Sequence, residues 1–348
     1  LLLPIIRGYP ILGSSDSDIF SHIGWIKDIA TFGKITKNDF YPIIHIFIYS
    51  FANILSIKAI VLSKYISIFL WTLYPIFMYL FGWIFTENKK IAIITALFSI
   101  PLIFSFFYHT IHPSLISFIF LPLLFYISWK KMKRELNLEF TVLIIVMSIF
   151  LVFFHPITTL MMILFFITLL VYKIVLKIIK TIFKTIDILE IKRLYLNKII
   201  TMLALIASTF IIWYISFDSG QYAIISIFNS LSGGSEISVT KSYMENLNTA
   251  RPTIIQTLRL IFFNYGAYII YMLIGAIFTF KWLIQLIRKK RLNKRNLIVV
   301  LFLVTSFIFS ASFIVMDLLV MNIIRSMRLF FLFLTFSSGL CTYAIIKH

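Results

Sequence analysis

The sequence predicts an all-α, polytopic membrane protein with about nine transmembrane helices and further helices lying along the external membrane surface. Of its 348 residues, 61% are hydrophobic and 13% are charged, whereas soluble domains have roughly 45–50% apolar and about 25% charged residues. Apolar runs of about 20 residues, the length that crosses a bilayer as a helix, recur along the chain. The single cysteine, Cys341, lies in one of these runs and excludes an internal disulfide framework.

The first 58 residues form one external unit in this prediction. They begin LLLPIIRGYP, with neither Met nor a basic stretch, so we expect a processed chain or a piece of a longer one whose preceding helix is missing. A helix that starts near Ser15 or Ser17 would place Asp18 and His22 on one face, four residues apart. The aspartates can act as helix caps or in chemistry, and the segment alone leaves both open.

Segment 41–57, YPIIHIFIYSFANILSI, is apolar enough to cross the membrane. Counting it as a span would reverse every later loop, so we predict a helix at the external face instead. Spans are predicted at 59–85, 91–107, 114–129, 141–154, 157–174, 199–216, 266–287, 297–315 and 329–346. These divide the chain into the external unit 1–58, a bundle 59–216, a long external loop 217–265 and the C-terminal helices 266–348.

The loops between the spans differ in charge. Those at one end carry about two thirds of the 32 Lys and Arg residues and fewer than half of the 13 Asp and Glu residues. The positive-inside rule makes this end cytoplasmic. The net charge of +19 is thereby explained, and no nucleic-acid partner is expected. The chemistry-bearing residues fall mainly on the external end.

Asp16, Asp18, the helix HIGWIKDIATFG and the following YPIIH resemble the first external loop of the GT-C class of glycosyltransferases. The resemblance covers the first 60 residues by motif and the later helices by hydrophobic pattern. These integral membrane enzymes take a sugar from a polyprenyl-phosphate or polyprenyl-diphosphate donor. They include protein O-mannosyltransferases, the aminoarabinose transferases of lipid A and oligosaccharyltransferases.

The resemblance implies roles for the first-loop acids. Asp18, or Asp16 beside it, would be the base toward the acceptor or, as in oligosaccharyltransferases, would help to hold a divalent cation such as Mg²⁺ or Mn²⁺. His22, Tyr41 and His45 have no fixed role in the class and are expected to line the same site. Glu236 in the long loop is an analogue of an acceptor-binding glutamate.

The reaction also needs cations for the leaving phosphate, which Arg binds in bidentate fashion. Arg325 and Arg328, in NIIRSMR before the last span, are the candidates. In YHTIHPS, His109 and His112 could bind a metal or make interfacial hydrogen bonds.

We therefore expect a membrane glycosyltransferase in the plasma membrane of a prokaryote, with its site facing outward. Its partners would be membrane lipid, a polyprenyl-linked sugar donor and a glycan, lipid or protein acceptor of the cell envelope. Two alternatives belong to other classes: a lipid or glycan transporter or flippase, which would carry charges near the bilayer midplane, and a non-catalytic structural subunit.

The orientation predicts how introduced cysteines react. With Cys341 replaced, a cysteine at Ser235 should be labelled by an impermeant thiol reagent in intact cells, whereas one at Asn293 should react only after permeabilisation. Labelling of the Asn293 position alone in intact cells would reverse the orientation.

Overall fold

The computed structural model describes residues 17–37, 39–103, 112–133, 138–182, 196–218, 220–222, 225, 253–289, 294–317 and 323–346. The regular elements of this part are all helices. They are α2 (Ser17–Phe32), α3 (Ile43–Ile54), α4 (Ala59–Thr86), α5 (Lys89–Ile103), α6 (Pro113–Lys133), α7 (Leu138–Phe154), α8 (Pro156–Ile182), α9 (Leu196–Ile215), α12 (Ile254–Lys289), α13 (Lys294–Asp317) and α14 (Ile323–Ile346).

The all-helical membrane class is confirmed. Five stretches are long and apolar enough to cross a membrane, and they lie in α4, α6, α8, α9 and α14. Shorter apolar stretches lie in α3, α7, α12 and α13. Each of the nine predicted spans coincides with a helix, and segment 41–57 contains α3. The number of crossings stays a prediction.

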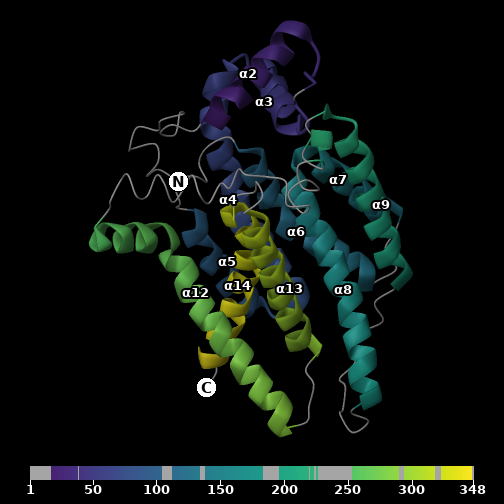
Figure 1. Cartoon of the computed structure of the whole chain (residues 1–348), viewed down its shortest axis with the longest axis vertical. Coiled ribbons are helices and arrows are strands. Elements are labelled where there is room, and N and C mark those ends of the chain that lie inside the picture. Colours follow the sequence, from purple (N-terminus) through teal and green to yellow (C-terminus); the bar gives the residue numbers. More distant parts are fainter. Residues whose placement is uncertain are drawn as a thin grey trace.

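The helices form an elongated bundle with α2 and α3 at one end (Figure 1). In this bundle α4 packs against α5 and α6, α8 packs against α9 and α13, and α14 packs against α5, α12 and α13. The starts of α6, α8 and α14 meet near α2 and α3, as contacts of His112, His155 and Arg328 show. We call this region the α2/α3 end.

Four buried phenylalanines join four helices in the middle of the bundle. Phe125 of α6 stacks on Phe165 of α8 with ring centroids 4.2 Å apart and on Phe333 of α14 at 5.9 Å. Phe302 of α13 closes the set, at 5.2 Å from Phe165 and 4.6 Å from Phe333. The interplanar angles of these pairs lie between 8° and 12°. Offset stacking is a favourable geometry for aromatic rings, so this phenylalanine layer holds α6, α8, α13 and α14 in register.

Small residues let α4, α5 and α14 approach closely. A Cβ atom on Gly339 of α14 would lie 2.6 Å from Thr95 Oγ1 and 3.2 Å from the Thr95 Cα of α5. A Cβ on Gly82 of α4 would lie 3.2 Å from the Ala92 Cα of α5 and 3.3 Å from the same Thr95 Oγ1. Close backbone approach through small residues is a common way for helices to associate in membranes.

Helix α12 is longer than the span predicted at 266–287. It begins at Ile254, within the segment 217–265 that we predicted as an external loop. Thr253 and Gln256 form a reciprocal capping box at its start, because the Thr253 N–H donates to Gln256 Oε1 at 2.9 Å and the Gln256 N–H donates to Thr253 Oγ1 at 3.3 Å. Figure 1 shows that α12 then bends, so that its first part crosses the direction of the bundle.

The close approach at Gly339 predicts that even a methyl side chain at this position lowers the stability of the protein. Gly339→Ala should lower the free energy of unfolding by about 1–3 kcal/mol, because the added methyl group meets Thr95 main-chain atoms that cannot move aside alone. Gly24→Ala on α2 is the matched control, since a Cβ there meets nothing within 4 Å and alanine favours the helix. Thermal unfolding in detergent measures both. Equal stability of the two variants would contradict the proposed packing.

Candidate functional site

Helix α2 is amphipathic and contributes His22 to the candidate site from its buried face. His22, Ile26 and Ile29 are buried on this face, and Trp25 is half-buried beside them. The spacing of three and four residues is that of one side of an α-helix. Gly33, with φ of 65°, ends the helix by donating its N–H to the Ile29 carbonyl at 2.9 Å.

The short connection between α2 and α3 positions the carboxylate of Asp39. The Asp39 N–H donates to the Thr36 carbonyl at 3.1 Å, which closes a turn. Trp213 of α9 holds the next residue, because its Nε1–H donates to the Phe40 carbonyl at 2.9 Å. Helix α3 begins after Pro42 and carries His45 in its first turn. Asp39 and His45 are thus brought together within one short segment.

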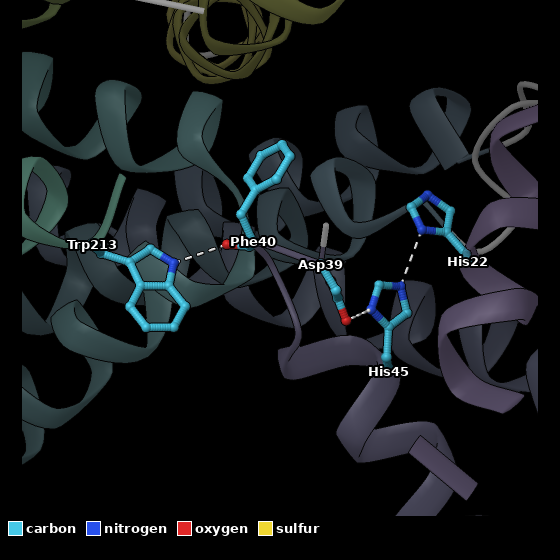
Figure 2. A network of polar contacts seen from close by, with 5 residues as sticks. All are labelled: His22, Asp39, Phe40, His45 and Trp213. Atoms are coloured by element: carbon cyan, nitrogen blue, oxygen red, sulfur yellow. Dashed lines mark hydrogen bonds and ion pairs between the residues drawn. The ribbon is translucent and has the colours of Figure 1, made fainter. Parts of the chain in front are cut away.

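Asp39, His45 and His22 form a continuous polar chain (Figure 2). Asp39 Oδ2 lies 2.7 Å from His45 Nδ1, and His45 Nε2 lies 3.1 Å from His22 Nδ1. Asp39 and His45 are fully buried, and His22 is 4% exposed. We refer to these three residues as the Asp39–His45–His22 chain.

Aromatic rings surround the chain and exclude water from it. Trp25 lies 5.3 Å from His22 and 5.3 Å from His45, measured between ring centroids. Tyr41 lies 5.9 Å from His22, and His112, just before α6, lies 6.2 Å from it. Low-dielectric surroundings of this kind strengthen hydrogen bonds between charged or polarised groups.

Arg328, near the start of α14, contributes a cation beside the start of α6. Arg328 of α14 donates from Nη1 to Ser114 Oγ at 3.2 Å, and Ser114 is buried in the first turn of α6. Ser114 follows His112 by two residues, so Arg328 contacts the same start of α6 that carries His112 just before it. Arginine binds phosphate oxygens through a planar fork of N–H donors.

The start of α8 contributes a neighbouring group with local partners. His155 is buried, and its ring lies 5.4 Å from that of Tyr41. Its Nδ1 accepts the Ile157 N–H at 3.2 Å, and its carbonyl accepts the Thr158 hydroxyl at 2.8 Å. These contacts shape the first turn of α8 after Pro156, a residue favoured at that position.

Asp39 is an unusual residue for a purely structural core. Its Oδ1 atom is buried and has no hydrogen-bond partner among the described residues. Leaving a buried polar atom unpaired costs about 1–3 kcal/mol, and more for a charged group. A carboxylate kept in such a place therefore calls for a functional explanation.

The predicted site residues divide into two sets. His22, Tyr41, His45, His112 and Arg328 gather at the α2/α3 end. Asp18 and Arg325 lie on the helical backbone of α2 and α14, and their side chains are outside the described part. Asp16, His109 and Glu236 lie outside the described residues altogether.

Sequence reasoning missed Asp39 and Trp25. The signal for Asp39 was its position in DFYPIIH, an acid six residues before a histidine and just ahead of a proline-started helix. The signal for Trp25 was its spacing of three residues from His22. Among the residues that the structure describes, no group of three or more metal ligands is found.

The hydrogen bond from Trp213 to the Phe40 carbonyl predicts that Trp213 stabilises the segment between α2 and α3. Trp213→Phe should keep the aromatic contact with Phe153 but remove the donor to the Phe40 carbonyl, at a cost of about 1 kcal/mol. Hydrogen exchange of the amides at 39–41 should become faster. Trp83→Phe, on the exposed side of α4, is the matched control and should leave these amides unchanged. Unchanged exchange in Trp213→Phe would show that this hydrogen bond does not hold the segment.

Comparison of the chain with protein-family models, with curated proteins and with solved structures finds no match in any of the three. A function has to be inferred from the chemistry of the side chains at the α2/α3 end.

Proposed function

We propose that the protein is a membrane glycosyltransferase that moves a sugar from a polyprenyl-phosphate-type donor to a hydroxyl group of an acceptor. The observation that carries the proposal is that a cation and a buried histidine cluster both contact the start of α6, at one end of an apolar bundle. Arg328 contacts Ser114 at 3.2 Å, and His112, two residues before Ser114, lies 6.2 Å from His22.

The transfer reaction makes three physical demands. A base must take the proton of the acceptor hydroxyl, which contributes roughly 10²–10⁴-fold to the rate. A cation must stabilise the negative charge of the leaving phosphate. An apolar environment must hold the polyprenyl tail while the reacting phosphate stays at the membrane surface.

Arg328 meets the second demand in this proposal. Its contact with Ser114 holds the guanidinium group at the first turn of α6, where the helix dipole also favours an anion. Arg325, one turn earlier on α14, is the second candidate from the sequence. The apolar surface of the bundle, with exposed side chains such as Phe69, Ile76 and Leu97, suits the third demand.

The first demand has candidates on the same helix of the chain. The resemblance to GT-C enzymes assigns the base to Asp18 or Asp16, with a divalent cation as an option. His22 lies four residues after Asp18 on α2 and belongs to the described cluster. The assignments to Asp18 and to His22 both put the base on α2.

The two alternative classes differ from the proposal in where polar groups lie. A transporter needs ionisable groups near the bilayer midplane. Of the buried side chains in the described part, the acidic one is Asp39, which lies outside the five candidate spans. A structural subunit needs no convergence of polar side chains, whereas His22, His45, His112 and Arg328 come from four separate elements. The location of Asp39 and the convergence of these four side chains therefore favour the transferase over the two alternatives.

The proposal includes the arrangement in the membrane. Nine crossings place the α2/α3 end on the external face of the plasma membrane and the basic loops in the cytoplasm. The acceptor is then a glycan, lipid or protein of the cell envelope, and the proposal includes a prokaryotic origin because the composition is rich in Ile, Lys, Phe and Asn.

The test is transfer of labelled mannose or glucose from the corresponding polyprenyl phosphate in membranes that contain the chain, compared with membranes that lack it. Arg328→Lys should lower transfer roughly 10-fold or more, because lysine keeps the charge but loses the planar fork. Arg259→Lys, at an exposed position of α12, is the matched control and should keep full transfer. Arg325→Lys tests the second candidate.

Two results would contradict the proposal. The absence of transfer above background with both donors would remove these donors as substrates of the chain. Full transfer in both Arg328→Lys and Arg325→Lys, at equal expression, would remove the arginines from phosphate binding.

A further inference from the structure

We propose that the Asp39–His45–His22 chain is a proton relay, and that His22 Nε2 is the atom that takes the proton of the acceptor hydroxyl. The identity of the proton's source rests on the proposed function. The existence of the relay rests only on the geometry of three buried residues.

The hydrogen bonds assign the tautomers of both rings. A carboxylate can only accept, so Asp39 Oδ2 requires the proton of His45 on Nδ1. In neutral His45, Nε2 then carries a lone pair and must accept from His22 Nδ1. Neutral His22 consequently has its proton on Nδ1 and a lone pair on Nε2. Figure 2 shows that this second nitrogen points away from His45.

The relay takes the proton of the acceptor hydroxyl into the buried chain while negative charge develops on the leaving phosphate. The acceptor oxygen attacks the anomeric carbon of the sugar, the bond from that carbon to the phosphate oxygen breaks, and the polyprenyl phosphate leaves with the bonding electrons. The hydroxyl proton passes to His22 Nε2, and the Nδ1 proton of His22 passes to His45 Nε2. His45 is then an imidazolium beside the Asp39 carboxylate, at 2.7 Å.

Burial explains why three residues are used instead of one. A histidine alone in this apolar region would have to carry a positive charge with little solvation. The Asp39 carboxylate supplies the compensating negative charge. His45 links this carboxylate to His22 on α2 through its two ring nitrogens. Asp39 and His45 are therefore positioning residues, and His22 is the catalytic residue. The same logic governs the histidine and aspartate of serine proteases, where the aspartate orients the histidine and stabilises its cationic form.

The location of the relay suits its task. His22 faces the side on which His112 and, beyond it, Ser114 and Arg328 lie. A proton acceptor and a phosphate-binding cation thus flank one region from different helices. Trp25 and Tyr41 pack against the His22 ring and limit its rotation.

The proton positions can be measured without any substrate. In the full chain labelled with ¹⁵N-histidine and held in lipid nanodiscs, protonated and bare ring nitrogens have separate chemical shifts. At alkaline pH we expect His22 and His45 each to carry the proton on Nδ1, with signals assigned through His22→Gln and His45→Gln. A proton on Nε2 of His22 throughout the titration would overturn the relay.

Catalysis separates the relay from a structural role. His22→Gln and Asp39→Asn should each lower transfer by about 100-fold or more at equal expression. Added imidazole should restore part of the activity to His22→Ala, and substituted imidazoles should do so in the order of their basicity, which a packing defect would not produce. His155→Gln is the matched control: it changes a buried histidine at the same end and should retain most transfer.

The outcomes distinguish the relay from the proposed function. If wild-type membranes transfer no sugar, the proposed function fails, and the proton positions alone decide the relay. If wild-type membranes transfer sugar and Asp39→Asn and His22→Gln do so equally fast, the relay fails while the function stands. Loss of transfer in Asp18→Asn with full transfer in Asp39→Asn would likewise assign the base to the first-loop carboxylate.

Discussion

Parallel stacking of four buried phenylalanines holds together the helices on which the candidate site depends. Phe125, Phe165, Phe302 and Phe333 link α6, α8, α13 and α14. Lipid tails are as apolar as these side chains, so the helices gain from close packing rather than from leaving water. The phenylalanine layer sets how far each helix reaches toward the α2/α3 end. Three of the four helices have their first turns there, which is why His112, His155 and Arg328 meet residues distant in sequence.

Polar groups inside the bundle are handled in two ways. In the apolar middle, hydroxyl groups pair with each other or with backbone carbonyls, as Thr168 of α8 does with Thr305 of α13 at 2.9 Å and with the Leu164 carbonyl at 2.8 Å. These two threonines are neutral and satisfied locally. At the α2/α3 end, a carboxylate and two histidines are buried together. Asp39, His22 and His45 lie outside the five candidate spans, where the proposed reaction on a lipid phosphate would have access to water-soluble acceptors.

The candidate site depends on a segment with little stability of its own. Residues 33–37 and 39–42 lie outside the helices, and they reach their position through the turn at Thr36 and the hydrogen bond from Trp213 to the Phe40 carbonyl. Helices α2 and α3 contribute Ile26, Ile44, Ile48 and Ala52 to the main hydrophobic core. The Asp39–His45–His22 chain is consequently tied to the bundle through α2 and α3 and, through Phe40, to Trp213 of α9.

Local patterns in the sequence determined the class, the positions of the helices and the faces of α2, because apolar runs and a spacing of three to four residues are properties of neighbouring residues. The alternation of basic and weakly charged loops also grouped His22, His45, His112 and Arg328 on one side before any contact was known. Tertiary structure alone decided that Asp39 is the partner of His45, that Arg328 reaches Ser114 across 214 residues, and that Gly339 packs on Thr95. These pairings depend on how helices pack side against side. The hydrophobic pattern alone allows many ways of packing the apolar helix surfaces against one another, and only the close fit of particular side chains distinguishes them.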